Sequence, residues 1–533
     1  MAEARPLTSV PIDVPALGAA PGHPASTTGG ADGPGDRLLV LCPQGGRPEA
    51  EFNAAIAAAL VKAGARRVDV SVVCLRESDA ETIRALAPAV HVAESFERFH
   101  DRTPAPDLAA ETLRLARDYA DVNWWAIAAA ERSFVDSSFL IGGLGQRSES
   151  QEYVEALIVG LVRHLEAVFS EGRYSAAVCQ AADSLMSYIF HQVARRFAAQ
   201  LLVLSPNAWI REDGKPGFYI GYDEFMHNAR MEAHYRELGH RPLREDERQR
   251  SRRFQQTVRD FEITRAFRSI MNRPFIVPAV SPNLRRLWTY LHENTARRKE
   301  IEYYKIDVAA KARANMLRVW RRWRSRRLLG SSVPAIPPRS VFYPMQYQPE
   351  QTTLVGGIYF ANQVALVENL AKALPFGCTL VVKEHPRGRG ARPAWQYRHL
   401  AHFPNVRFCD ADAKEIIRRC EAVVTITSTV GLEAMALDRP VIVLGNCYYD
   451  FADVVYRPKN WPELAQALKR ILIDGEYRSN AARGEWIDRF FLAYLRARVP
   501  AALSRDSADA VAEGLLAELE ARRNPAVAAA AQY

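Results

Sequence analysis

Two short phrases within residues 380–445 constrain the fold of this 533-residue chain more than any other stretch. The first, VVKEHP, occupies residues 381–386, and the second, TITSTVGLEA, occupies residues 425–434. Each begins with apolar, β-branched residues that are typical of a buried strand, and each ends in polar residues. Ligands of open parallel sheets bind at the carboxyl ends of the strands, where such polar residues lie. The phrases therefore predict an α/β domain with a phosphate site at one sheet edge.

Strand-like and helix-like segments alternate on both sides of an Arg-rich middle part. A strand at 37–42, a helix at 51–63 and a strand at 68–75 give the β-α-β rhythm of a doubly wound sheet, and a similar alternation starts at residue 340. A helix is expected at 108–134. Because a chain of this length is too long for one hydrophobic core, we predict two α/β domains.

The predicted organisation has five parts, and the stiff, Pro-rich stretch at 334–338 marks the main boundary. The N-terminal part is rich in Pro, Gly, Ala and Thr and cannot bury enough apolar surface to fold. In order, the parts are a disordered tail at 1–36, an α/β domain at 37–210, a helical, basic connector with its linker at 211–335 (with one strand-like run at 275–280), an α/β domain at 336–500, and a C-terminal helix with a frayed tail at 501–533.

The seven cysteines are scattered and form no Cys-x-x-Cys pair. Their odd number and spacing favour reduced thiols in a cytosolic chain over a disulfide framework or a structural zinc site. No run of about 18 apolar residues predicts a transmembrane helix, and the N-terminus lacks the pattern of a secretory signal.

The first phrase offers a cation and an imidazole to a phosphate. His385 follows the predicted strand, and Pro386 fixes the backbone beside it. Its imidazole can donate a hydrogen bond to a phosphate, more strongly when protonated. Lys383 lies on the same face of the extended chain and adds a positive charge. The alternative for His385, a loop histidine that caps a neighbouring group, stays open.

The second phrase offers hydroxyls and a glycine at the start of a helix. Ser428, Thr429 and Gly431 form the strand-to-helix turn, where backbone N–H groups and the helix dipole favour an anion. Plain N-capping by the hydroxyls is the alternative. Glu433 lies about one turn into the helix, and its carboxylate suits a ribose diol, although a surface role fits equally well.

Three carboxylates are candidates for acid–base or nucleophilic chemistry. Asp183 follows a predicted strand and precedes a helix, where an N-cap is the alternative role. Glu131 is a weaker candidate from a helical stretch. Glu350 follows the first strand of the second domain, where a solvated loop carboxylate is the alternative. The pair Asp410 and Asp412 resembles a metal-binding pair, but we favour a capped helix start.

The segment 311–330 contains eight Lys or Arg residues and no acidic residue. Trp320 and Trp323 lie three residues apart on one face of the predicted helix. The segment fits a solvated helix whose Trp residues pack on the protein, an interfacial helix on anionic lipid, or a binding surface for an acidic polymer. The candidate acceptor or membrane residues are Arg318, Trp320, Arg321, Arg322 and Trp323.

Four phrases in this order resemble the capsule polysaccharide biosynthesis family, which is similar to the bacterial Kdo transferases of capsule assembly. The phrases are YPMQYQPE at 343–350, KEHP at 383–386, TSTVGLEA at 427–434 and PVIVLG at 440–445. The resemblance is close over residues 341–450 and covers the first domain only in its general rhythm.

The resemblance implies a GT-B glycosyltransferase, in which two Rossmann-like domains face each other across a cleft. The domain at 37–210 would bind the acceptor, and the domain at 336–500 would bind the nucleotide-sugar donor. In related CMP-sugar transferases a His-Pro motif and a Ser/Thr motif hold the CMP phosphate, so the resemblance assigns that role to His385, Ser428 and Thr429. The donor would be CMP-Kdo or a related CMP-sugar.

The expected activity is transfer of this sugar to a glycan or lipid-linked acceptor in surface polysaccharide biosynthesis, without a metal or other cofactor. The expected partners are a nucleotide sugar, a polysaccharide or glycolipid acceptor and an anionic inner-membrane surface, with no specific nucleic acid. The expected location is cytoplasmic, peripheral on the inner face of the membrane. A nucleotide-sugar 2-epimerase on the same fold and a non-catalytic component of capsule export are the alternatives.

Overall fold

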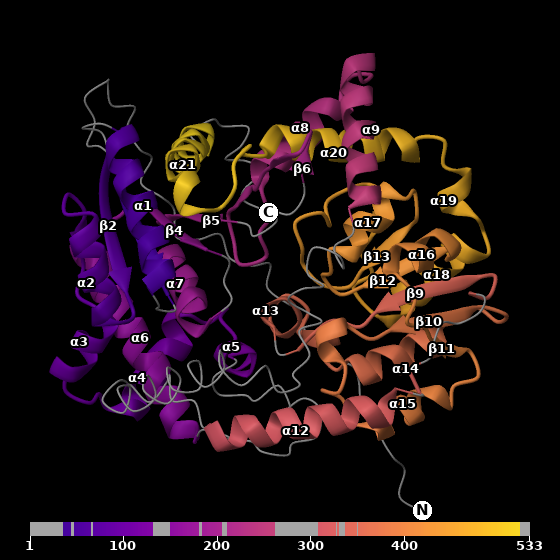
Figure 1. The fold of residues 1–533 in the computed structure, drawn as a ribbon, viewed down its shortest axis with the longest axis horizontal. Helices are drawn as coiled ribbons and strands as arrows, with labels where there is room; N and C mark the ends of the chain where they lie inside the picture. Colours follow the sequence, from indigo (N-terminus) through magenta and orange to yellow (C-terminus); the bar gives the residue numbers. More distant parts are fainter. Residues whose placement is uncertain are drawn as a thin grey trace, which may run out of the picture. The chain divides into compact units, whose positions relative to one another are not determined.

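The computed structural model describes residues 36–43, 47–64, 68–131, 150–180, 184–204, 211–261, 308–326, 328–329, 336–348 and 350–522. Two six-stranded sheets organise these residues, and helices pack against both (Figure 1). The predicted α/β class with two Rossmann-like domains is confirmed. The predicted tail at 1–36, except Asp36, and the predicted strand at 275–280 lie outside the described residues.

The first sheet has the strand order β3-β2-β1-β4-β5-β8. Its central strands are buried apolar runs, as parallel strands covered on both faces require. All neighbours pair in parallel except β5 and β8, which are antiparallel. The strands are β1 (Asp36–Cys42), β2 (Val68–Cys74), β3 (His91–Val92), β4 (Ala176–Gln180), β5 (Gln200–Leu204) and β8 (Ile220–Gly221).

The predicted single helix at 108–134 is wrong, because the chain forms two shorter helices there. The first helix ends at Asp118, and the side chain of Asn123 accepts a hydrogen bond from the Ala126 N–H to begin the second. The helices of this part are α1 (Arg47–Gly64), α2 (Glu77–Leu86), α3 (Phe96–Arg102), α4 (Leu108–Asp118), α5 (Trp124–Ala130), α6 (Gln151–Gly172) and α7 (Leu185–Arg196).

The second sheet is entirely parallel, with the order β11-β10-β9-β12-β13-β14. The chain runs outward from β9 on one side and then outward from β12 on the other. The order therefore reverses between β9 and β12, which is the ligand-binding position of doubly wound sheets. The strands are β9 (Ser340–Pro344), β10 (Thr379–Lys383), β11 (Val406–Phe408), β12 (Ala422–Thr425), β13 (Val441–Val443) and β14 (Val455–Tyr456).

Short helices follow the strands of the second sheet, and longer ones close this part of the chain. They are α13 (Gln351–Leu354), α14 (Gln363–Ala373), α15 (Ala394–Ala401), α16 (Ala413–Arg419), α17 (Val430–Ala436), α18 (Trp461–Leu472), α19 (Glu476–Ser479) and α20 (Arg483–Ala497), with 3-10 turns at Ile358–Phe360, Pro386–Gly388 and Arg505–Ser507.

The described part of the connector packs mainly on the second sheet. Helices α8 (Ala229–Gly239) and α9 (Glu245–Asp260) follow the hairpin of β6 (Arg211–Glu212) and β7 (Lys215–Pro216). Both lie against α20, and α9 also contacts α17. Their buried residues Tyr235 and Phe254 share one hydrophobic core with Phe490 and Tyr494. Helix α12 (Val308–Ser325) contacts α15.

The last described helix, α21 (Ala508–Arg522), returns to the first sheet. It lies beside α1, as Figure 1 shows in yellow and indigo. Val511, Ala512 and Leu515 are fully buried in the same hydrophobic core as the strands of that sheet. Helix α21 therefore completes the hydrophobic core around the first sheet.

All seven cysteines are free, in agreement with the predicted reduced thiols, and all are buried. Within the part of the chain that the structure describes, no helix combines the length and the apolar character needed to cross a membrane.

Candidate functional site

A cavity of about 330 Å³ opens at the carboxyl ends of β9, β10 and β12, where the strand order reverses. Residues from both phrases, at 381–386 and 425–434, line this cavity. The lining residues are Pro344, Met345, Gln346, Tyr347, Glu350, Thr352, Lys383, Glu384, His385, Pro386, Asp412, Ala413, Lys414, Thr427, Ser428, Thr429, Val430 and Glu433.

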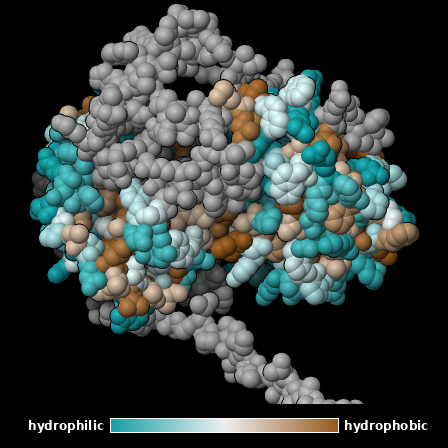
Figure 2. All heavy atoms as spheres, turned by 90° about the horizontal axis from the view of Figure 1, so that it is seen from below, coloured by the Kyte–Doolittle hydropathy of each residue, from teal (hydrophilic) through white to brown (hydrophobic). Residues whose placement is uncertain are grey.

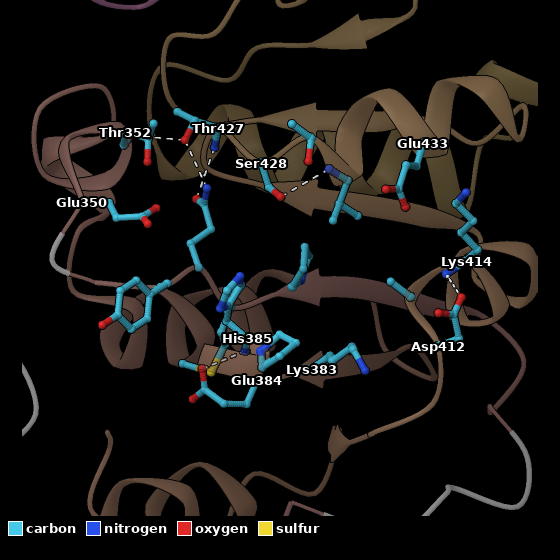
Figure 3. A pocket seen from close by; sticks show the side chains of 18 residues that line it. Glu350, Thr352, Lys383, Glu384, His385, Asp412, Lys414, Thr427, Ser428 and Glu433 are labelled. Carbon is cyan, nitrogen blue, oxygen red and sulfur yellow. Dashed lines mark hydrogen bonds between the residues drawn. The ribbon is translucent and has the colours of Figure 1, made fainter. Parts of the chain in front are cut away.

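The two phrases form facing walls of this cavity. Figure 3 shows His385 entering from one side and Ser428 from the other, with Glu350 at one end and Glu433 with Lys414 at the other. The order of the strands in the sheet explains this arrangement. Strand β9 pairs with both β10 and β12. The residues that follow β10 and those that follow β12 therefore meet at the carboxyl end of β9.

A buried carboxylate holds the His-Pro wall in place. Glu384 turns away from solvent and accepts hydrogen bonds from the His385 backbone N–H at 2.8 Å and the Tyr397 hydroxyl at 2.8 Å. It also forms an ion pair with Arg392 at 3.0 Å, in which the two side chains are only 2% and 5% exposed. The imidazole of His385 lies beside the Tyr347 ring, with the ring centroids 5.9 Å apart. Glu384 therefore fixes the backbone from which His385 projects.

Lys383 lines the cavity but directs its ammonium group toward a neighbouring loop. Its Nζ donates to the Ala411 carbonyl and lies 3.5 Å from Asp410, which also pairs with Arg389. Burial lowers the pKa of Lys383, and the carboxylate of Asp410 opposes that shift. Its expected contact with a phosphate stays a prediction.

The favoured role of the Asp410–Asp412 pair, a capped helix start, is confirmed. Asp412 is the N-cap of α16 and accepts a hydrogen bond from the Lys414 N–H at 2.9 Å. Among the described residues, no group of His, Cys, Asp or Glu has the arrangement of a metal site.

The hydroxyl wall is tied to the end of β9 by Gln346. Its amide donates to Thr427 Oγ1 at 3.1 Å and accepts from the Thr427 N–H at 3.3 Å. Ser428 Oγ accepts a hydrogen bond from the Val430 N–H at 3.2 Å, so this hydroxyl does cap the start of α17. Thr429 is the N-cap residue, and its side chain makes no capping hydrogen bond. Both hydroxyl side chains line the cavity.

Gly431 lies behind the hydroxyl wall, outside the lining of the cavity. A Cβ atom at this position would lie 2.3 Å from the Tyr449 hydroxyl, which donates to the Ser428 carbonyl. The glycine is thus required by the close approach of Tyr449, and its predicted contact with a nucleotide stays a prediction.

Glu433 and Lys414 close one end of the cavity. Glu433 is 6% exposed, and its burial raises the pKa of its carboxyl to about 7, although the charge of Lys414 opposes the shift. The ammonium of Lys414 donates to the carbonyls of Val258 and Phe261 at the end of α9. This end of the cavity is therefore coupled to the connector helix α9.

The raised pKa of Glu433 leads to a pH-dependent stability. Between the ordinary value of 4.5 and the folded value of about 7, the folded chain binds more protons than the unfolded chain. The free energy of unfolding therefore falls as pH rises through this window. We expect Glu433→Gln to be more stable than the parent protein above the window, by on the order of 2 kcal/mol.

Urea denaturation on both sides of the window measures this effect. The stability gain of Glu433→Gln should shrink as the pH falls toward the lower end of the window, because the parent carboxyl is then neutral in both states. A gain that is the same at every pH would contradict the raised pKa.

The candidate catalytic carboxylates are not brought together. Glu350 lines the cavity beside Thr352 (Figure 3). Glu131 is buried in the first α/β domain, where its Oε2 accepts a hydrogen bond from the Leu185 N–H at 2.7 Å at the start of α7. No described residue of the first sheet lines the cavity. Asp183 lies outside the described residues.

The five candidate residues of the basic helix divide into two groups. Arg321 is buried and donates to the Ala391 carbonyl at 3.0 Å, and Arg318 Nη2 lies 3.5 Å from the Tyr347 hydroxyl. Arg322, Trp320 and Trp323 are exposed. The alternative in which both Trp residues pack on the protein is therefore wrong.

Sequence reasoning missed several residues that build the site. Gln346 lies within the phrase at 343–350, directly after a strand. Its position at the carboxyl end of that strand is a signal that could have indicated a site residue. Arg392, Tyr397 and Lys414 act through contacts with residues distant in the sequence, and no local pattern indicates them.

The residues around the cavity lie in the part of the chain that matches a known protein family. The family described as "Capsule polysaccharide biosynthesis protein" matches residues 298–465, which include β9 to β14 and every lining residue. The resemblance to the capsule polysaccharide biosynthesis family is confirmed.

Two curated relatives align with parts of this chain. Protein FixF of Sinorhizobium fredii is 36% identical over 155 residues, which cover 27% of this chain and 36% of FixF. The capsule polysaccharide export protein KpsS of Escherichia coli is 32% identical over 107 residues, which cover 18% of this chain and 26% of KpsS. The aligned stretches thus span about a third or less of these relatives.

Among solved structures, KpsC of Thermosulfurimonas dismutans, described as a beta Kdo 2,7 transferase, aligns with 56% of this chain and 74% of its own. The two share 14% sequence identity, and the TM-score is 0.29. The sequence similarity to capsule polysaccharide biosynthesis proteins that the family model finds lies at residues 298–465, which include the second sheet.

Proposed function

We propose that this protein is a glycosyltransferase of surface polysaccharide biosynthesis that binds a nucleotide-sugar donor in the cavity of its second sheet. One observation carries the proposal: the His-Pro phrase and the Ser/Thr phrase, which the capsule family resemblance links to phosphate binding, converge on one cavity at the reversal of strand order. A CMP-activated sugar, Kdo or a related sugar, is the proposed donor, because that resemblance is to CMP-sugar transferases.

The proposed roles follow from the positions of the side chains. His385 on one wall and the hydroxyls of Ser428 and Thr429 on the other would donate hydrogen bonds to the donor phosphate. Glu433 would accept hydrogen bonds from the ribose hydroxyls at the closed end of the cavity. The hydrogen bonds from His385, Ser428 and Thr429 would stabilise the negative charge that develops on the phosphate as the bond to the sugar breaks.

Of the predicted catalytic carboxylates that the structure describes, Glu350 lines the cavity and Glu131 does not. We propose that Glu350 removes the proton from the acceptor hydroxyl as the new glycosidic bond forms, while the phosphate leaves with the bonding electron pair. The acceptor would be a polysaccharide or a glycolipid.

We propose that the donor is held without a metal or other cofactor. The carboxylates of Asp410 and Asp412, the pair that resembles a metal site, already have partners in the protein. Asp410 pairs with Lys383 and Arg389, and Asp412 caps α16. The side chains proposed to contact the phosphate, those of His385, Ser428 and Thr429, can all donate hydrogen bonds. We propose that the reaction takes place at the cytoplasmic face of the inner membrane.

A thermal-shift comparison of CMP, UDP and GDP tests the proposed donor. A ligand at about 100 times its Kd stabilises the folded state by about 2.7 kcal/mol, which is a readily measured rise in Tm. We expect CMP to give the largest rise. A response to UDP with none to CMP, or conversion of UDP-GlcNAc in the absence of an acceptor, would contradict the proposal and favour an epimerase.

A further inference from the structure

Helix α12 is anchored to the second α/β domain by a polar face. Arg321 and Ser325 are buried, and Arg321 donates to the Ala391 carbonyl at 3.0 Å. Gly390 has a φ of +79° and lies so close that a Cβ atom would be 2.3 Å from the Arg318 carbonyl oxygen. The helix is therefore held against the loop that follows the His-Pro motif.

The opposite face of α12 is apolar and exposed. Met316, Val319, Trp320 and Trp323 are 68%, 48%, 50% and 75% exposed. Their spacing of three, four and seven residues places them on one side of the helix. A helix of a globular protein normally buries such a stripe, so its outward direction indicates a binding surface.

Exposed arginines surround this apolar stripe. Arg322, Arg324 and Arg326 are exposed. The Arg324 guanidinium lies over the Trp320 ring, 5.2 Å from its centroid. The residue sequence from 311 to 330 contains no acid that would neutralise them.

We propose that α12 docks on the surface of an anionic lipid bilayer. Trp and Arg suit the headgroup region, where each presents an apolar part and a polar part. Met316 and Val319 favour lipid over an acidic glycan or a nucleic acid, because a polar polymer gains nothing from aliphatic side chains. Figure 2 shows hydrophobic side chains in separate groups among hydrophilic ones on the face seen from below.

Docking in this way relates the bilayer to the donor cavity. Arg318 on α12 lies 3.5 Å from the hydroxyl of Tyr347, which lines the cavity. A lipid-linked acceptor in the bilayer would thus lie near the donor site. Docking by α12 rests on the proposed location at the membrane. Binding to vesicles can be measured without a nucleotide, so it is tested separately from the donor site.

Co-sedimentation of the full chain with vesicles tests the proposal. We expect binding to vesicles of phosphatidylcholine with phosphatidylglycerol, little binding to phosphatidylcholine alone, and weaker binding at high salt. The double variant Trp320→Ser, Trp323→Ser should lose binding, and Arg322→Gln, Arg324→Gln should weaken it at least about tenfold. Phe376→Ser is the matched control, because Phe376 is fully exposed elsewhere and should leave binding unchanged.

Every variant is compared with the parent for Tm and for its response to CMP, so loss of folding or of the donor site is recognised separately. Failure of the parent chain to bind anionic vesicles, or unchanged binding by the Trp variant, would overturn the proposal. So would a concentration-dependent dimer that the Trp variant abolishes, or tighter binding of a soluble acidic polymer that the Trp variant retains.

Discussion

Replacement of His385 by Ala is expected to weaken the binding of CMP by between about 10-fold and 100-fold, because one charge-assisted hydrogen bond to the phosphate is lost. The imidazole lies in the cavity wall opposite Ser428 (Figure 3). Isothermal titration calorimetry of the parent protein and the variant measures the change in Kd. Since the backbone of His385 is held by Glu384, we expect the Tm without ligand to change little.

His399→Ala is the matched control for this substitution. His399 lies on α15, is 49% exposed and pairs with Glu368 at 2.6 Å, outside the cavity. This variant should bind CMP as the parent does. Equal CMP affinities of the His385 variant and the parent would place the nucleotide site elsewhere.

Arg392→Ala is expected to lower the free energy of unfolding by about 3–5 kcal/mol, because it leaves the Glu384 carboxylate buried without its cationic partner. The variant should also bind CMP more weakly, since the backbone of His385 depends on Glu384 for its position. Urea denaturation measures the first effect, and calorimetry measures the second.

Two further variants identify the cause of this loss. Glu384→Gln in the Arg392→Ala background should recover part of the stability, because the unpaired charge is removed. Arg419→Ala breaks an exposed pair with Glu415, whose side chains are 52% and 47% exposed, and should cost less than about 1 kcal/mol. A similar loss in both Arg variants would show that burial of the Glu384–Arg392 pair is unimportant.

The position of the cavity could be predicted from the sequence because it depends on local patterns. An apolar strand that ends in polar residues places those residues at the carboxyl edge of a parallel sheet. Two such phrases, at residues 381–386 and 425–434, are sufficient to locate the two walls. The strands and most helices follow from the same periodicity.

The functions of individual residues were harder to predict because they depend on contacts between distant segments. Gly431 fits a phosphate loop by its local sequence, but Tyr449 approaches it from another loop. Lys414 caps the end of α9, which lies more than a hundred residues earlier. In α12 the periodicity placed Trp320 and Trp323 on one face, but it could not indicate that the polar face with Arg321 is the buried one.

The return of α21 to the first sheet affects how the chain folds during its synthesis. The ribosome completes β5 at Leu204 but does not reach α21 until Ala508. At about 5–20 residues per second, roughly 15–60 s pass between the completion of β5 and the synthesis of the helix that covers α1. The apolar face of α1 lacks its covering helix during that interval, so we expect the nascent chain to bind chaperones that recognise such surfaces. A fragment that ends after the first sheet would keep this face exposed permanently.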